Sequence, residues 1–100
     1  MRILFEQTGG FMGRTVDLNL DLKDLPEDQA ETLRQLLEQA NFFGLEENLA
    51  RQSYPDAYQY QIKVETERME HTVHASDGNV PESLRPLVDE LSKRARLQRI

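Results

Sequence analysis

Apolar and polar side chains alternate without interruption along the stretch Val16-Asp17-Leu18-Asn19-Leu20-Asp21-Leu22-Lys23, and this pattern is the strongest indication of the fold. A period of two is typical of a β-strand that buries one face and exposes the other. Segment 9–13, which precedes it, contains three glycines, and these supply the positive-φ positions of a hairpin connection. The apolar segment Ile3-Leu4-Phe5 comes before them. We therefore expect residues 2–7 and 14–22 to form a β-hairpin.

A helix is expected after the second strand. The segment Asp24-Leu25-Pro26-Glu27 predicts its start, with Asp24 as the capping residue and Glu27 at the spacing of a capping box. Gly44 is the expected stop, which leaves Phe42 and Phe43 to pack at the helix end. Between this start and this stop, apolar residues recur at helical spacing and form one stripe: Ala30, Leu33, Leu36, Leu37 and Ala40.

The second half of the chain repeats this scheme. Residues 44–56 have no clear period and predict a long loop, whereas residues 58–65 alternate again and predict a third strand. A fourth strand is expected at about 69–75. A second helix follows, and because Pro86 would break a helix interior, it either begins with a separate turn at 81–84 or kinks.

These elements predict an α+β fold of ββα-ββα order. We expect a two-layer sandwich in which a four-stranded antiparallel sheet carries two helices packed on one face. The chain has 100 residues, a length typical of one domain, so we expect residues 1–100 to form a single domain.

Composition excludes several classes of protein. The chain has 12 basic and 18 acidic side chains, a net charge of −6, and ten of the acidic residues lie in residues 1–50. Such a chain is a poor partner for nucleic acid, because a phosphate backbone repels it. There is no cysteine, so disulfides, thiolate metal sites and thiol nucleophiles are excluded.

The sequence also predicts no association with a membrane. No apolar run approaches the roughly 18–20 residues needed to cross a bilayer. A charge follows Ile3-Leu4-Phe5 directly, which is unlike a signal peptide. We therefore expect a cytoplasmic protein, and we favour a monomer.

Nothing in the sequence predicts a catalytic or metal site. His71 and His74 are three residues apart on a predicted strand, where they face opposite sides and cannot share a metal ion. Asp17, Asn19 and Asp21 are explained by a solvated sheet face, and no serine lies in a nucleophile motif. We expect no enzyme activity and no cofactor.

The most suggestive local feature is the segment Gly9-Gly10-Phe11-Met12-Gly13. It lacks the lysine and the following helix of a phosphate-binding loop, so a plain flexible hairpin turn is one interpretation. Phe11 and Met12, however, are large and apolar where turns usually carry polar residues. Either they fold back onto an open sheet edge or they contact a partner. The basic residues at the C-terminus (Lys93, Arg94, Arg96 and Arg99) are expected to complement the negative end of the last helix.

The chain resembles the emfourin family of small bacterial protein inhibitors of thermolysin-like (protealysin-type) metallopeptidases. The resemblance rests on the order and spacing of several segments that span nearly the whole chain. These are Thr8-Gly9-Gly10-Phe11-Met12-Gly13, Leu22-Lys23-Asp24-Leu25-Pro26, Phe42-Phe43-Gly44-Leu45, Tyr58-Gln59-Tyr60-Gln61-Ile62-Lys63-Val64, His71-Thr72-Val73 and the run from Val80 to Val88.

This resemblance implies an α+β fold and competitive inhibition of a zinc endopeptidase. It does not place the contact residues. The glycine hairpin (Gly9, Gly10, Phe11, Met12 and Gly13) is the first candidate, and the 44–56 loop is the second. Because the chain offers no thiolate, we expect steric occlusion of the cleft and no capture of the metal. The alternative is an interaction or adaptor domain without a protease target.

Overall fold

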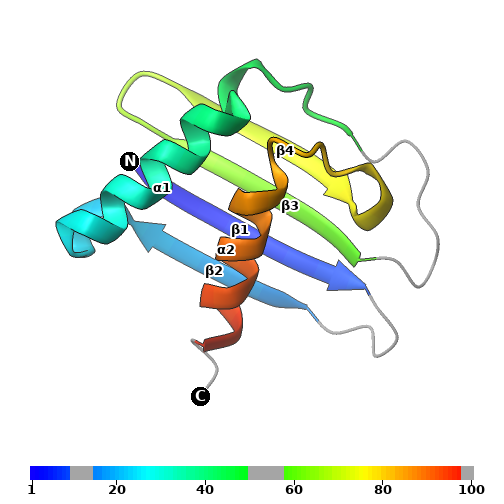
Figure 1. Cartoon of the computed structure of the whole chain (residues 1–100), viewed down its shortest axis with the longest axis horizontal. Coiled ribbons are helices and arrows are strands. Elements are labelled where there is room, and N and C mark those ends of the chain that lie inside the picture. The colour runs from blue at the N-terminus through cyan, green and yellow to red at the C-terminus, as the bar shows by residue number, and fades with distance from the viewer. Residues whose placement is uncertain (10–14, 50–57, 98–100) are drawn as a thin grey trace.

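The fold is built from four strands and two α-helices (Figure 1). The computed structural model describes residues 1–9, 15–49 and 58–97. The strands are β1 (Arg2–Gly9), β2 (Val16–Asp21), β3 (Tyr58–Glu65) and β4 (Glu70–Ser76), and the helices are α1 (Glu27–Ala40) and α2 (Arg85–Leu97). Three short 3-10 turns complete the described part: η1 (Leu22–Asp24), η2 (Phe42–Gly44) and η3 (Asp77–Asn79).

The strands form one antiparallel sheet in the order β2-β1-β3-β4. The predicted hairpin of β1 and β2 is present, and Phe5 lies opposite Leu18 in its register. On the other side of β1, Phe5 lies opposite Ile62. Phe5, Leu18 and Ile62 therefore lie side by side on one face of the sheet, as the period of two predicts.

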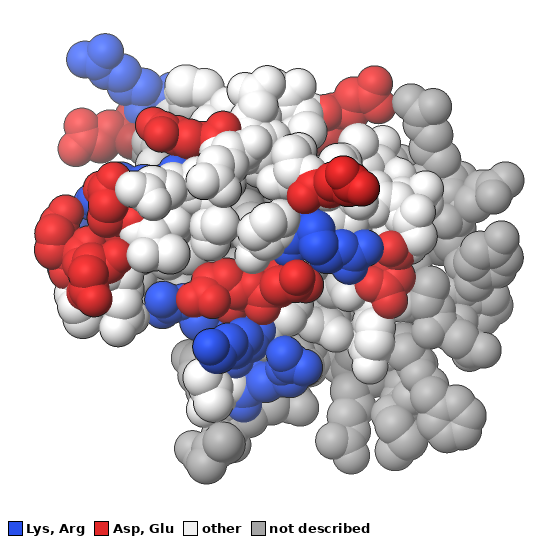
Figure 2. Space-filling model, in the orientation of Figure 1, with Lys and Arg blue, Asp and Glu red and all other residues white. Residues whose placement is uncertain are grey.

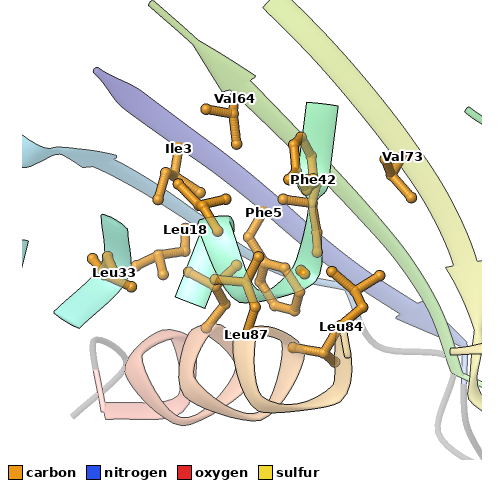
Figure 3. Packing of buried hydrophobic residues seen from close by; sticks show 14 of the residues in the cluster. Ile3, Phe5, Leu18, Leu33, Phe42, Val64, Val73, Leu84 and Leu87 are labelled. Carbon is orange, nitrogen blue, oxygen red and sulfur yellow. The ribbon is translucent and has the colours of Figure 1, made fainter. Parts of the chain in front are cut away.

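Both helices cover this apolar face, and the core lies between the two layers (Figures 1 and 3). Leu33 of α1 and Leu87 of α2 are fully buried, and so is Ile3 of β1. Phe42, just after α1, is buried, and the neighbouring Phe43 packs against the cluster, as expected. The predicted α+β sandwich with two helices on one face is confirmed.

The start of α1 differs from the prediction. Asp24 belongs to η1, and Pro26 occupies the N-cap position without a side-chain hydrogen bond. The backbone N–H groups of Gln29 and Ala30 donate instead to the Pro26 carbonyl. The prediction of Asp24 as the cap was wrong because the chain makes an additional 3-10 turn before the helix begins.

The end of α1 differs as well. The helix stops at Asn41, which adopts a left-handed conformation with φ 49° and ψ 50°. Asparagine tolerates this conformation better than most residues do. Gly44, the predicted stop, lies three residues later in η2, where its N–H donates to the Asn41 carbonyl.

Helix α2 begins after a separate turn, which was one of the two predicted alternatives. The Pro81 carbonyl accepts hydrogen bonds from the N–H groups of Leu84 and Arg85. Pro86 then occupies the first turn of α2, where no helical hydrogen bond is lost. Arg94 and Arg96 lie in the last turn, and Figure 2 shows basic side chains gathered at that end of the helix.

Candidate functional site

Three strand ends meet at one end of the sheet. Gly9, the last residue of β1, lies opposite Tyr58, the first residue of β3. The end of β4 lies beside them, because Ser76 is opposite Gln59. In the sequence, residues 10–14 follow Gly9 and residues 50–57 precede Tyr58, and both segments lie outside the described residues. The end of the sheet that holds Gly9, Tyr58 and Ser76 lies on the right in Figure 1. We call it the exit end of the sheet.

Gly9 has a φ of 92°, a value that residues with a Cβ rarely adopt. The residue still belongs to β1 and keeps its register with Tyr58. Glycine is therefore the residue that fits the end of β1 with the least strain.

A polar network holds the exit end together. The hydroxyl of Tyr60 donates a hydrogen bond of 2.9 Å to Oδ1 of Asp77. Arg85 Nη1 lies 3.6 Å from that oxygen, and Arg85 Nη2 donates to the Asp77 carbonyl at 3.1 Å. Burial, followed by the hydrogen bond to Asp77, raises the pKa of Tyr60 well above its ordinary value. The network joins β3, η3 and α2.

The described part of the 44–56 segment is attached to the sheet. The N–H of Leu49 donates to the His74 carbonyl, and the N–H of His74 donates to the Glu47 carbonyl, each at 2.7 Å. These bonds form a short parallel bridge along the outer edge of β4. His71 Nε2 also lies 2.7 Å from the Leu45 carbonyl, which accepts its hydrogen bond. Up to Leu49, this segment therefore covers a sheet edge.

The predicted site residues are only partly described. Gly9 lies at the exit end, whereas Gly10, Phe11, Met12 and Gly13 lie outside the described residues. The alternative segment is described up to residue 49, and residues 50–56 lie outside. Sequence reasoning missed the network of Tyr60, Asp77 and Arg85, because no local pattern connects residues so far apart in the chain.

The two histidines point to opposite faces, as predicted. His71 lies opposite Val64 on the core face, and its ring makes edge contacts with Phe42. His74 lies opposite Gln61 on the face without helices. Among the described residues, no group of three His, Asp or Glu side chains could hold a metal ion. Neither α-helix in the described chain is long and apolar enough to span a membrane.

These features define a small α+β fold whose four-stranded antiparallel sheet is covered by two helices on one face. The chain belongs to the emfourin family, whose family model matches residues 5–92. Membership suggests a metallopeptidase-inhibitor role. No curated protein and no solved structure compared with the chain gave a significant match.

Proposed function

We propose that this protein inhibits a thermolysin-like (protealysin-type) zinc metallopeptidase by filling its substrate cleft with the exit end of the sheet. Family membership supports the class of target. The choice of this end of the sheet as the inhibitory surface rests on the register of β1 and β3, in which Gly9 lies opposite Tyr58. Because these residues are partners, the two candidate segments adjoin neighbouring strands and can act on one cleft together.

The sequence between the strands suits such a cleft. A thermolysin-like cleft accepts extended chain with a bulky apolar side chain beside the catalytic zinc. Phe11 and Met12 supply two such side chains between glycines. Large apolar residues that enter a pocket usually dominate the energy of an interface. Gly9 and the Tyr60 network fix the base from which this segment departs, and a fixed base lowers the entropy lost on binding.

Steric occlusion is favoured over capture of the target's zinc. The sequence contains no cysteine, so no thiolate can reach the metal. The ring of His71 is turned to the core and bonded to the Leu45 carbonyl. The exposed side chain of His74 lies on the face without helices, within β4 and outside both segments proposed to enter the cleft.

Alanine variants assayed against thermolysin test the proposed surface. The double variant Phe11→Ala/Met12→Ala should weaken inhibition by about 2 kcal/mol or more, which is about a thirtyfold rise in the inhibition constant. Met69→Ala is the matched control, because Met69 is 53% exposed and lies in the turn between β3 and β4, at the opposite end of the sheet. This control should inhibit like the wild type.

The results show which end of the sheet contacts the protease. Equal inhibition by the double variant and the wild type would move the interface away from segment 9–13. If Met69→Ala were the weaker inhibitor, the opposite end of the sheet would be the contact. Circular dichroism of each variant establishes that the fold is retained.

A further inference from the structure

The sheet face that carries no helix is acidic along β1 and β2. This open face is turned away from the viewer in Figure 1. Asp17, Asn19 and Asp21 of β2 lie on it together with Glu6 of β1, because they alternate with the buried residues. Asp17, Asn19 and Glu6 are exposed. Asp and Asn are disfavoured in strands. Asp21 caps η1 by accepting a hydrogen bond from the N–H of Lys23, whereas Asp17 and Asn19 have no such local role among the described residues.

The charge on this part of the face is not neutralised. Glu6 and Asp17 lie directly opposite each other, and like charges in that arrangement are destabilising. Neither forms an ion pair within the described part of the chain. On the β3 side the situation differs, because Lys63 Nζ lies 3.3 Å from Glu65 and 3.8 Å from Glu70. Arg2 of β1 also lies on this face, opposite Asp21 and Glu65. Glu6 and Asp17 are therefore the carboxylates of this face that neither lie opposite a basic residue nor pair with one among the described strands.

The same residues border a free sheet edge. Among the described strands, β2 pairs with β1 alone, whereas the 47–49 segment covers part of the edge of β4. The N–H of Leu22 donates to the Met1 carbonyl, so the backbone of Leu22 faces β1. This bond shows which residues of β2 turn their backbone groups toward β1 and which turn them outward. Every second residue turns its N–H and C=O toward β1. The backbone groups of Asp17 and Asn19 therefore point outward, where a further strand could pair.

The open face is also hollowed beside this edge. A hollow of about 690 Å³ extends over β1, β2 and β3. Its lining includes the half-buried Leu4 as well as Glu6, Asp17 and Asn19. Lys63 and Glu65 line its β3 side, where Lys63 is paired with Glu65 and Glu70. On the β2 side, a side chain entering the hollow would meet the apolar surface of Leu4 beside Glu6 and Asp17, which suits the aliphatic stem and charged head of lysine or arginine.

We propose that the edge of β2 binds an extended basic segment of a partner protein, which adds to the sheet as a further strand. Backbone hydrogen bonds to Asp17 and Asn19 would hold the segment. Its Lys or Arg side chains, at every second position, would lie on the open face beside Glu6 and Asp17 and remove the unfavourable pairing of charges.

A second copy of this chain is a poorer occupant of the edge. If two copies of β2 paired antiparallel about Asn19, Asp17 of one copy would lie opposite Asp21 of the other. Parallel pairing in register would place each carboxylate beside its own counterpart. Like charges across a strand pair disfavour both arrangements. The acidic edge thus selects against self-association and for a basic partner.

A peptide titration without any protease tests this surface separately from the proposed inhibition. The probe is a capped peptide of about seven residues with alternating Lys and Val, long enough to span the six residues of β2. Added to the ¹⁵N-labelled full chain, it should shift the amide signals of Asp17 and Asn19 and slow their hydrogen exchange. Binding should weaken at least about tenfold between roughly 50 and 300 mM salt. A peptide with Glu in place of Lys should not bind.

Charge-neutral variants locate the contact. Glu6→Gln/Asp17→Asn should weaken binding of the basic peptide at least about fivefold. Glu38→Gln/Glu82→Gln is the matched control, because it removes the same charge from exposed residues outside the sheet. Unchanged affinity of the first variant would overturn the proposal. So would signal changes confined to α1, no binding up to millimolar peptide, or a dimer formed through β2.

Discussion

Gly9 at the end of β1 lies directly opposite Tyr58 at the beginning of β3. The sequence left segments 9–13 and 44–56 as alternative contact regions, because nothing along the chain shows how they relate. The register relates them, since neighbouring strands lie about 4.8 Å apart. Gly9 begins the first segment and Tyr58 lies two residues after the second, so their register supports the proposal that one target cleft contacts both segments.

The conformation of Gly9 predicts the effect of adding a side chain there. Gly9→Ala should lower the free energy of unfolding by about 1–2 kcal/mol, because φ is 92° and a Cβ is strained in that region. In a chain of this size, each kcal/mol lowers the melting temperature by roughly 4–8 °C. Differential scanning calorimetry measures the change.

Gly78→Ala is the matched control for that experiment. Gly78 lies in η3 and does not have a positive φ, and an added Cβ would meet nothing within 4 Å. The substitution should therefore leave stability unchanged or raise it by up to about 1 kcal/mol. Equal losses in the two variants would contradict the conformational explanation.

The hydrogen bond from Tyr60 to Asp77 predicts a loss of stability in Tyr60→Phe. The variant should lose about 1 kcal/mol at neutral pH, because the Asp77 carboxylate is partly exposed and keeps Arg85 as a partner. Urea unfolding measures this loss. Tyr58→Phe is the control, since the Tyr58 side chain is 41% exposed, and it should unfold like the wild type.

The raised pKa of Tyr60 adds a prediction for alkaline pH. Burial and Asp77 favour the neutral phenol in the folded state, so the folded chain keeps a proton that the unfolded chain loses near pH 10. The stability that this group contributes is fully present well below pH 10 and is lost above it, with a slope that approaches about 1.4 kcal/mol per pH unit as the unfolded chain loses its proton. Wild-type stability should therefore decline relative to Tyr60→Phe between pH 10 and 11. Parallel curves would show that the two states do not differ in the pKa of Tyr60.

Asn41 and Gly44 should be energetically coupled. A Cβ added at Gly44 would lie 2.6 Å from Nδ2 of Asn41, so Gly44→Ala must displace that side chain at a cost of about 1 kcal/mol. In the Asn41→Gly background the obstacle is absent and the cost should vanish. Asn41→Gly alone should change stability by less than about 0.5 kcal/mol, because glycine also suits the left-handed cap. Chemical denaturation of all four proteins measures the coupling, and additive effects would disprove the contact.

The strands were predictable because their pattern is local. The alternation from Val16 to Leu22 fixes which side chains are buried, and the partners in the sheet follow from that pattern and the hairpin. The helix boundaries were less predictable. Asp24 and Gly44 have the right chemistry for caps, but η1 and Asn41 take those roles, because tertiary packing decides between candidates only a few residues apart.

The candidate site was predictable only in part. The glycines and the apolar pair Phe11 and Met12 are visible in the sequence. The register of Gly9 with Tyr58 and the bond from Tyr60 to Asp77 are not, because each joins residues that only the folded chain brings together. The bridge between Asn48 and His74 was missed for the same reason, since residues 44–56 show no period.

A titration of the wild-type protein against thermolysin at several substrate concentrations tests whether this protein occludes the substrate cleft. Occlusion of the cleft predicts inhibition at or below micromolar protein, with an apparent inhibition constant that rises linearly with substrate concentration. Full protease activity at micromolar protein would contradict the proposed function for this target. Inhibition independent of substrate concentration would contradict occlusion of the substrate cleft.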